Sequence, residues 1–204
     1  MNRKNFRPTL VDLIALLNVI LFFGLCYVVY FDRFIHYRGR EYLWEFFLYA
    51  ILLMGIIVFI WRLVRLVPIH PLLLLFFQLG ICMHFAGGLA IFHTSRLYDK
   101  IVFGIRYDKY VHLFNSFTGA LFLQELYLKN VRLEKWLKNV QLVVITLGVG
   151  AGIEIVEYLV TLTVKVNGVG GYDNNMQDLV ANLLGSLLAV VVIRWFRFPG
   201  DICD

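Results

Sequence analysis

Residues 10–31 read LVDLIALLNVILFFGLCYVVYF, an apolar run with a single charged side chain, Asp12. As an α-helix that rises 1.5 Å per residue, a run of this length covers about 30 Å, the thickness of the hydrocarbon layer of a bilayer. The run is also longer than the apolar core of a secretory signal. It therefore predicts a transmembrane helix that the protein retains.

Five further apolar runs follow, and each predicts another membrane helix. They are residues 42–66, 72–92, 110–128, 140–163 and 176–196. Of all residues, 60% are hydrophobic and 16% are charged, and the mean hydropathy is +0.75, whereas about a quarter of the residues in soluble domains are charged. The sequence predicts an all-α fold: a polytopic membrane protein in which a bundle of six transmembrane helices forms one integral membrane domain over residues 1–204.

The net charge of +5 does not indicate binding to nucleic acid. The Lys and Arg side chains stand at the ends of the apolar runs, where they can meet lipid headgroups, and they form no basic stripe interleaved with aromatic residues. More of them flank the side of the membrane that holds the N-terminus, above all in the segment 129–138. The positive-inside rule then predicts that both termini are cytoplasmic.

Ionisable and amide side chains are concentrated in the last four predicted helices, at spacings that place them on single helical faces. The pairs that share a face are Asp108 and His112 in the fourth helix, Glu154 and Glu157 in the fifth, and Asp178 and Asn182 in the sixth. His84 lies in the third helix, and Asp173 lies in the loop before the sixth. With the N-terminus inside, all of them fall in the outer half of the membrane.

A charged side chain at the centre of a bilayer costs roughly 2.5–3.5 kcal/mol on insertion scales, so such residues face a bundle interior and are functional candidates. Carboxylates together with imidazole suit a divalent metal ion such as Mg, Mn or Zn. The predicted ligands are Asp108, His112, Glu154 and Asp178, with Asp173 and His84 as further candidates. Glu157 is the predicted general base or a further ligand, and Asn182 is predicted to orient a ligand or substrate.

A purely structural role is the alternative for the same residues. Polar side chains in membrane helices often hydrogen-bond across helices and only set their packing. Asp173 could simply cap the sixth helix, because Asp is a favourable N-cap residue. These alternatives stay open at the level of the sequence.

Three motif pieces occur in order along the C-terminal half: D-x-x-x-H from Asp108 to His112, E-x-x-E from Glu154 to Glu157, and D-x-x-x-x-D-x-x-x-N-x-x-G from Asp173 to Gly185. This pattern resembles the YjdF-like predicted membrane proteins and, more distantly, the VanZ-like proteins, over residues 107–192. The resemblance implies a bacterial inner-membrane protein of unassigned activity. The association of VanZ-like proteins with resistance to a glycopeptide antibiotic implies chemistry at the cell envelope.

Three functions are compatible with these observations. The first is a metal-dependent hydrolase or phosphoryl-transfer enzyme that acts on a lipid-linked or envelope substrate. The second is a proton- or cation-coupled transporter, in which the same carboxylates bind the coupling ion. The third is a non-catalytic membrane component whose polar face packs against a partner. An enzyme should show a dead-end cavity that opens to one leaflet or side, and a transporter should show a path that continues past Glu154 toward the cytoplasm. A packing role should leave the polar groups paired directly with each other, with no cavity.

Overall fold

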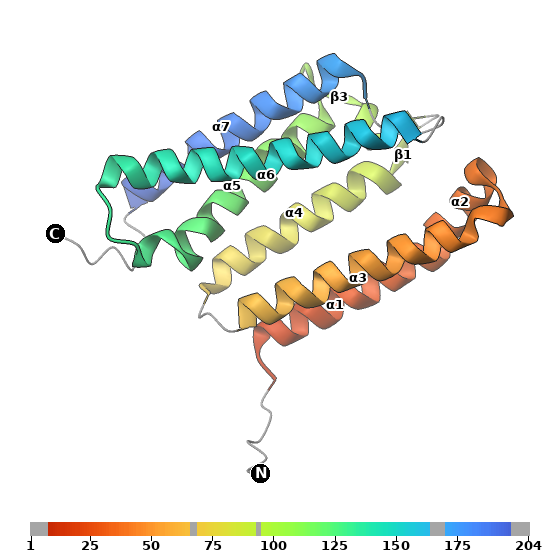
Figure 1. The fold of residues 1–204 in the computed structure, drawn as a ribbon, viewed down its shortest axis with the longest axis horizontal. Helices are drawn as coiled ribbons and strands as arrows, with labels where there is room; N and C mark the ends of the chain where they lie inside the picture. The colour runs from red at the N-terminus through yellow and green to blue at the C-terminus, as the bar shows by residue number, and fades with distance from the viewer. Residues whose placement is uncertain (1–7, 66–68, 93–94, 164–169, 197–204) are drawn as a thin grey trace, which may run out of the picture. The chain divides into compact units, whose positions relative to one another are not determined.

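The computed structural model describes residues 8–65, 69–92, 95–163 and 170–196. The chain divides into two compact units, Met1–Ile69 and His70–Asp204, which are described separately. Helices account for nearly all of the regular structure of the described residues (Figure 1). The predicted all-α class is therefore confirmed.

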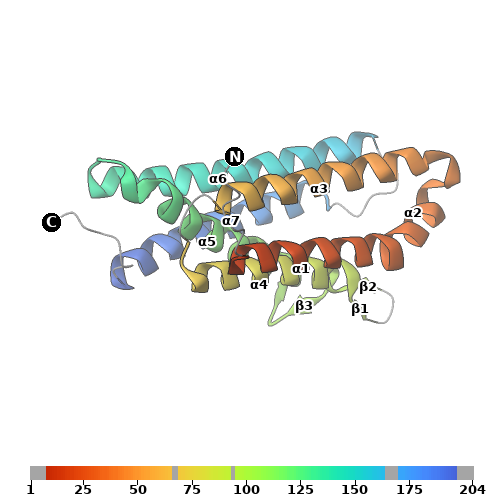
Figure 2. The same ribbon diagram turned by 90° about the horizontal axis from the view of Figure 1, so that it is seen from below.

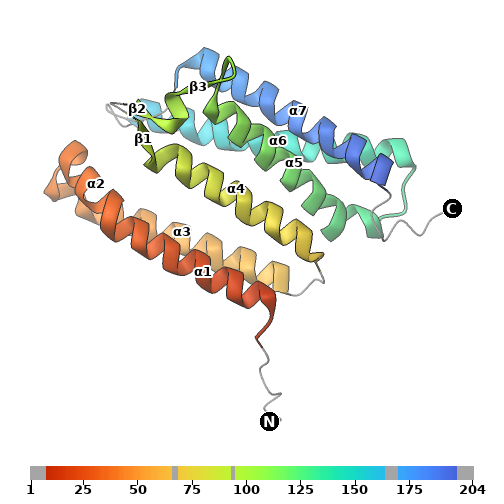
Figure 3. The ribbon, with the colours of Figure 1, turned by 180° about the vertical axis from the view of Figure 1, so that it is seen from behind.

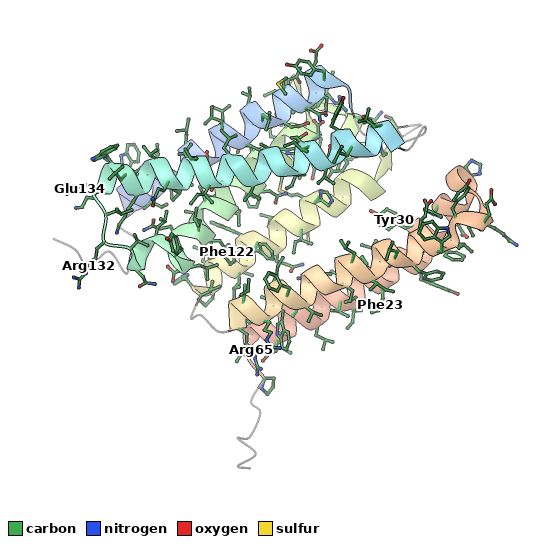
Figure 4. All side chains as sticks on the ribbon, viewed as in Figure 1. Phe23, Tyr30, Arg65, Phe122, Arg132 and Glu134 are labelled. Carbon is green, nitrogen blue, oxygen red and sulfur yellow. The ribbon has the colours of Figure 1, made fainter. Side chains whose placement is uncertain are left out.

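The first unit is a helical hairpin. It contains α1 (Leu10–Leu25), a π-helical turn η1 (Cys26–Tyr30), α2 (Phe31–Arg38), a 3₁₀ turn η2 (Arg40–Tyr42) and α3 (Leu43–Arg65). The helical path predicted over residues 10–31 is present, but it passes through the π-turn and continues into the polar helix α2. Figure 4 labels Phe23 and Tyr30 along this path and Arg65 at the end of α3.

Asp12 holds the two long helices of this unit together at one end. It forms a capping box with Thr9, the N-cap residue of α1. Its carboxylate also accepts a hydrogen bond from Nε1 of Trp61 at 2.9 Å and lies 3.0 Å from Nε of Arg65. The one charged side chain of the run 10–31 is thus a structural contact between α1 and α3.

The second unit holds four long helices: α4 (Pro71–Leu89), α5 (Tyr107–Leu126), α6 (Lys135–Thr163) and α7 (Tyr172–Phe196). A 3₁₀ turn, η4 (Leu128–Asn130), follows α5. In Figure 3 α5 lies between α4 and α7, and Figure 2 shows α6 running beside α7. The helices begin three to five residues earlier than the hydropathy predicts, at Tyr107, Lys135 and Tyr172. Their first turns are polar, and a helix end needs no apolar residues to form.

The segment between α4 and α5 is ordered rather than a plain loop. It consists of the hairpin β1 (Ile91–Phe92) with β2 (Ser95–Arg96), a 3₁₀ turn η3 (Leu97–Asp99), and the hairpin β3 (Ile101–Val102) with β4 (Ile105–Arg106). Two central residues with positive φ, Phe103 and Gly104, make the tight turn of the second hairpin. Both hairpins lie at the end of the unit where α7 begins (Figures 1 and 3).

Among the described residues, four helical segments are long and apolar enough to cross a membrane: Leu10–Val28, Arg40–Arg65, Lys135–Leu159 and Tyr172–Trp195. A multi-pass membrane protein is thus confirmed. The predicted total of six spans is not, because only Pro71–His84 of α4 is apolar enough and α5 carries charged residues in its first turn. Whether α4 and α5 cross the membrane stays a prediction.

Glycine permits the closest helix contact of the second unit. A Cβ atom at Gly185 of α7 would collide with the backbone carbonyl of Leu113, and it would lie 3.0 Å from the backbone nitrogen of Phe117, both in α5. Only a residue without a side chain lets the two backbones approach this closely. The polar residues of the site lie in the one or two turns that precede this contact in each helix, so the contact sets their separation.

Candidate functional site

Three helices bring predicted ligands to one place. His112 of α5 lies between Glu154 of α6 and Asp178 of α7, with its Nδ1 3.6 Å from Oε1 of Glu154 and its Nε2 3.5 Å from Oδ1 of Asp178. One ligand atom from each of these three residues lies within 4.8 Å of the others. The structure thus brings together three of the predicted ligands, one from each of α5, α6 and α7.

Lys109 is the centre of the hydrogen-bond network beside this cluster. Its Nζ lies 2.7 Å from Oδ1 of Asp178 and 3.2 Å from Oδ2 of Asp108, and it donates to Oδ1 of Asn174 at 2.9 Å. The backbone N–H of Lys109 also donates to Asp108, and Nδ2 of Asn174 donates to Oδ2 of Asp178. The carboxylates of Asp108 and Asp178 are thus held in fixed positions by a buried ammonium group.

Burial shelters these groups from both water and lipid. Asp108 and Lys109 are each 7% exposed, and Glu154 and Asp178 are 4% and 1% exposed. Both carboxylate oxygens of Glu154 lack a hydrogen-bond partner within the described residues. A buried carboxylate without partners is costly, so these oxygens are suited to hold a cation or a proton.

A cavity of about 600 Å³ adjoins the cluster. Its polar wall is made by side chains from the hairpin segment and from α4 to α7, namely His84, Arg96, Tyr98, Asp99, Arg106, Asp108, His112, Asn115, Ser116, Glu157, Asn174, Asp178 and Asn182. The predicted polar face of α5 lines this cavity from Asp108 to Gly119. A cavity of this size distinguishes the cluster from a set of polar contacts that only pack helices.

The remaining predicted residues lie at different places. Glu157 lines the cavity and is half-buried. Asn182 lines it as well, and its Oδ1 accepts a hydrogen bond from Ser116 at 3.0 Å. His84 lines it from α4, where its Nδ1 lies 2.6 Å from the hydroxyl of Tyr98 rather than near the ligand cluster. Asp173 is exposed in the first turn of α7, outside the cavity lining.

Sequence reasoning missed the basic residues of the site. Lys109 and Arg106 were counted only as flanking charges. Arg106 donates to Asn174 at 2.8 Å and lies 3.0 Å from Asp99, which also pairs with Arg96. The available signal was the position of Lys109 between Asp108 and His112, inside the same motif.

The charge of the site and its ligand types fit a divalent cation. Five carboxyl groups and three basic side chains line the cavity or contact residues that line it, which leaves a formal charge of −2 when all are ionised and histidine is neutral. The basic residues are Arg96, Arg106 and Lys109, and the acidic ones are Asp99, Asp108, Glu154, Glu157 and Asp178. Each carboxylate oxygen has two lone pairs, so Asp178 could bind a metal while keeping Lys109.

The fold and the site define a multi-pass, all-α membrane protein with a buried ionisable cluster beside a cavity. Residues 17–198 match the family described as "Predicted membrane protein (DUF2238)", and the chain belongs to that family. The finer resemblance to YjdF-like and VanZ-like proteins is not part of this match and stays a prediction. The chain matches none of the curated proteins and none of the solved structures with which it was compared.

Proposed function

We propose that this protein is a divalent-metal-dependent membrane enzyme that hydrolyses, or transfers a phosphoryl group of, a lipid-linked or envelope substrate. The observation that carries the proposal is the convergence of His112, Glu154 and Asp178 within 4.8 Å. The buried, unpartnered oxygens of Glu154 and the adjoining cavity support it. Mg, Mn and Zn all accept carboxylate ligands, and the imidazole favours Mn or Zn over Mg.

Each residue of the site has a role in this proposal. A bound metal would polarise a phosphoryl or carbonyl oxygen of the substrate. The metal would be held by His112, Glu154 and Asp178. Asp108, which pairs with Lys109, is a further candidate ligand of the metal. Lys109 orients the Asp178 carboxylate through its 2.7 Å contact. Glu157 faces the cavity as the candidate general base, and Asn182 offers an amide N–H to the substrate.

The position in the cell is part of the same proposal. The resemblance to YjdF-like proteins suggests a bacterial inner membrane, and the excess of Lys and Arg on one side favours both termini in the cytoplasm. The site lies near the helix ends that carry the hairpins, so this orientation places it in the outer half of the bilayer. A substrate of the cell envelope would then reach it from the outer leaflet.

Proton- or cation-coupled transport is the second candidate. The observation in its favour is the position of His112, whose two ring nitrogens face different carboxylates at 3.6 and 3.5 Å. An imidazole between two carboxylates can pass a proton from one to the other. Reconstituted vesicles with an internal dye for pH or for the coupling cation separate the two functions, because coupled transport changes the luminal concentration of the coupling ion without added hydrolysable substrate.

Loss of metal binding is the expected result of changing the predicted ligands. In purified protein, titration of Mn²⁺ followed by electron paramagnetic resonance should show one tight site. His112→Ala, Glu154→Gln and Asp178→Asn should each weaken it by roughly a hundredfold, because metal affinity falls 10–100-fold even when outer-shell partners are lost. Asp173→Asn removes an exposed carboxylate of the same helix and should leave the affinity unchanged.

Size-exclusion elution and thermal unfolding of each variant show whether the fold is retained. If the wild-type protein binds neither Mn²⁺, Zn²⁺ nor Mg²⁺, the metal-dependent function is wrong. Equal losses in Asp173→Asn and Asp178→Asn would contradict the placement of the site.

A further inference from the structure

The cavity changes character along the helices. At the hairpin end it is lined by charged residues, whereas the turns farther from the hairpins contribute apolar side chains: Phe122, Leu123 and Leu126 of α5 and Ile145 and Val149 of α6. From Asp108 to Leu126 the lining of α5 extends about 27 Å at 1.5 Å per residue. Figure 4 shows Phe122 on α5, away from the hairpins. The cavity therefore has a charged region at the hairpin end and a long apolar region beyond it.

The apolar end of the cavity borders the surface that faces lipid. Two α6 residues that line it are also strongly exposed, Ile145 at 41% and Val149 at 63%. They lie within Lys135–Leu159, a segment able to cross the membrane. Gly119 of α5 also lines the cavity and is exposed, and a Cβ atom added there would meet nothing within 4 Å. A hydrocarbon chain can therefore enter sideways from the bilayer.

Two buried polar atoms lie one turn or more farther along the helices than the charged cluster. Nδ2 of Asn182 and Oγ1 of Thr146 have no hydrogen-bond partner within the described residues, and their residues are 3% and 8% exposed. Both residues line the cavity. Oδ1 of Asn182 accepts from Ser116, whereas its Nδ2, which lies against Gly150 of α6, is a buried donor without an acceptor in the described residues. Donors at this depth suit the ester or ether oxygens that join a lipid head to its chains.

The charged end suits a phosphate head. Arg96 and Arg106 both line it, and Nε of Arg106 is buried without a partner in the described part of the chain. Arginine is well suited to phosphate because its planar group can donate two parallel hydrogen bonds. The surrounding carboxylates would repel a phosphate on their own, so a divalent cation is required to balance the charge.

From the order of charged, polar and apolar regions along the cavity, we infer that it binds a phosphate-headed lipid that enters from the bilayer between α5 and α6. The head lies at Arg96 and Arg106, the polar linkage lies at Asn182 and Thr146, and one hydrocarbon chain lies over Gly119. The inference rests on the proposed function, because it names the substrate class of the same site.

Binding of 1-oleoyl phosphatidic acid, measured by native mass spectrometry of the purified protein with Mn²⁺, tests the inference. Gly119→Leu puts a side chain into the path of the hydrocarbon chain and should weaken binding by about tenfold or more, since each excluded CH₂ group loses up to roughly 0.8 kcal/mol. Gly148→Leu is the matched control, because a Cβ atom at Gly148 also meets nothing and the residue lies outside the lining. It should bind as the wild type does.

Two comparison ligands separate the head from the chain. Monoolein has the chain without the phosphate and should bind more weakly than the phosphatidic acid. In Arg106→Gln the two lipids should bind with equal affinity. Inorganic phosphate has no chain and should not displace the lipid. Equal binding of monoolein, displacement by free phosphate, or equal affinities of Gly119→Leu and Gly148→Leu would each overturn the inference. Mn²⁺ binding without lipid is measured separately, so a failure of the metal site is distinguished from a failure of the lipid site.

Discussion

Replacing Lys109 by methionine is expected to lower the free energy of unfolding by about 3 kcal/mol. Methionine keeps most of the apolar volume of the side chain but removes the charge that faces Asp108 and Asp178. Both carboxylates are more than nine-tenths buried, so each would be left without its cation. The loss should lie at the lower end of the range for broken buried ion pairs, because Asn174 still donates to Asp178.

The measurement is the midpoint of unfolding in dodecyl maltoside with increasing sodium dodecyl sulfate, followed by circular dichroism. Lys135→Met is the matched control, because Lys135 is exposed at the start of α6, and it should change stability by less than about 0.5 kcal/mol. Adding Asp178→Asn to Lys109→Met should restore part of the stability, since it removes one of the uncompensated charges. A Lys109→Met protein as stable as the wild type would show that the ion pair does not form.

Gly185→Ala is expected to destabilise the protein by about 1–3 kcal/mol, the usual cost of adding a methyl group where there is no room. The added Cβ atom meets backbone atoms of Leu113 and Phe117, which cannot move without separating α5 from α7. Alanine is intrinsically the better helix former by up to about 1 kcal/mol, so a loss of stability would be due to packing alone.

Gly148→Ala provides the comparison, because its Cβ atom would meet nothing within 4 Å. It should be neutral or slightly stabilising in the same unfolding assay. Gly185→Ala should also weaken Mn²⁺ binding, because the α5–α7 contact sets the distance between His112 and Asp178. Equal stability of the two alanine variants would rule out the close approach of these helices.

The helical spacing of the polar residues predicted much of the candidate site. Residues four apart lie on the same face of a helix, so Asp108 with His112, and Asp178 with Asn182, had to face the same direction. Glu154 joined them because its helix packs against α7. The exposed position of Asp173 did not follow from this argument, because a residue in the first turn can face several directions.

The basic half of the site could not be predicted in this way. Lys109 lies about 100° around the helix from Asp108, so periodicity placed the two on different faces. The long, flexible lysine stem nevertheless carries its ammonium group back to both aspartates. Arg96, Asp99 and Arg106 reach the site only because two short hairpins turn the chain back over the helix ends.

The sequence by itself determined that this chain is a multi-pass helical membrane protein, because runs of apolar residues about 20 long can be buried only in lipid, and lipid requires closed backbone hydrogen bonding. It also determined which polar residues share a helical face. Tertiary structure alone decided which faces meet, how deep the cavity is and where Lys109 and the arginines reach. Those features depend on the distances between helices. Small residues such as Gly185 set these distances where two backbones touch, and no local sequence pattern encodes them.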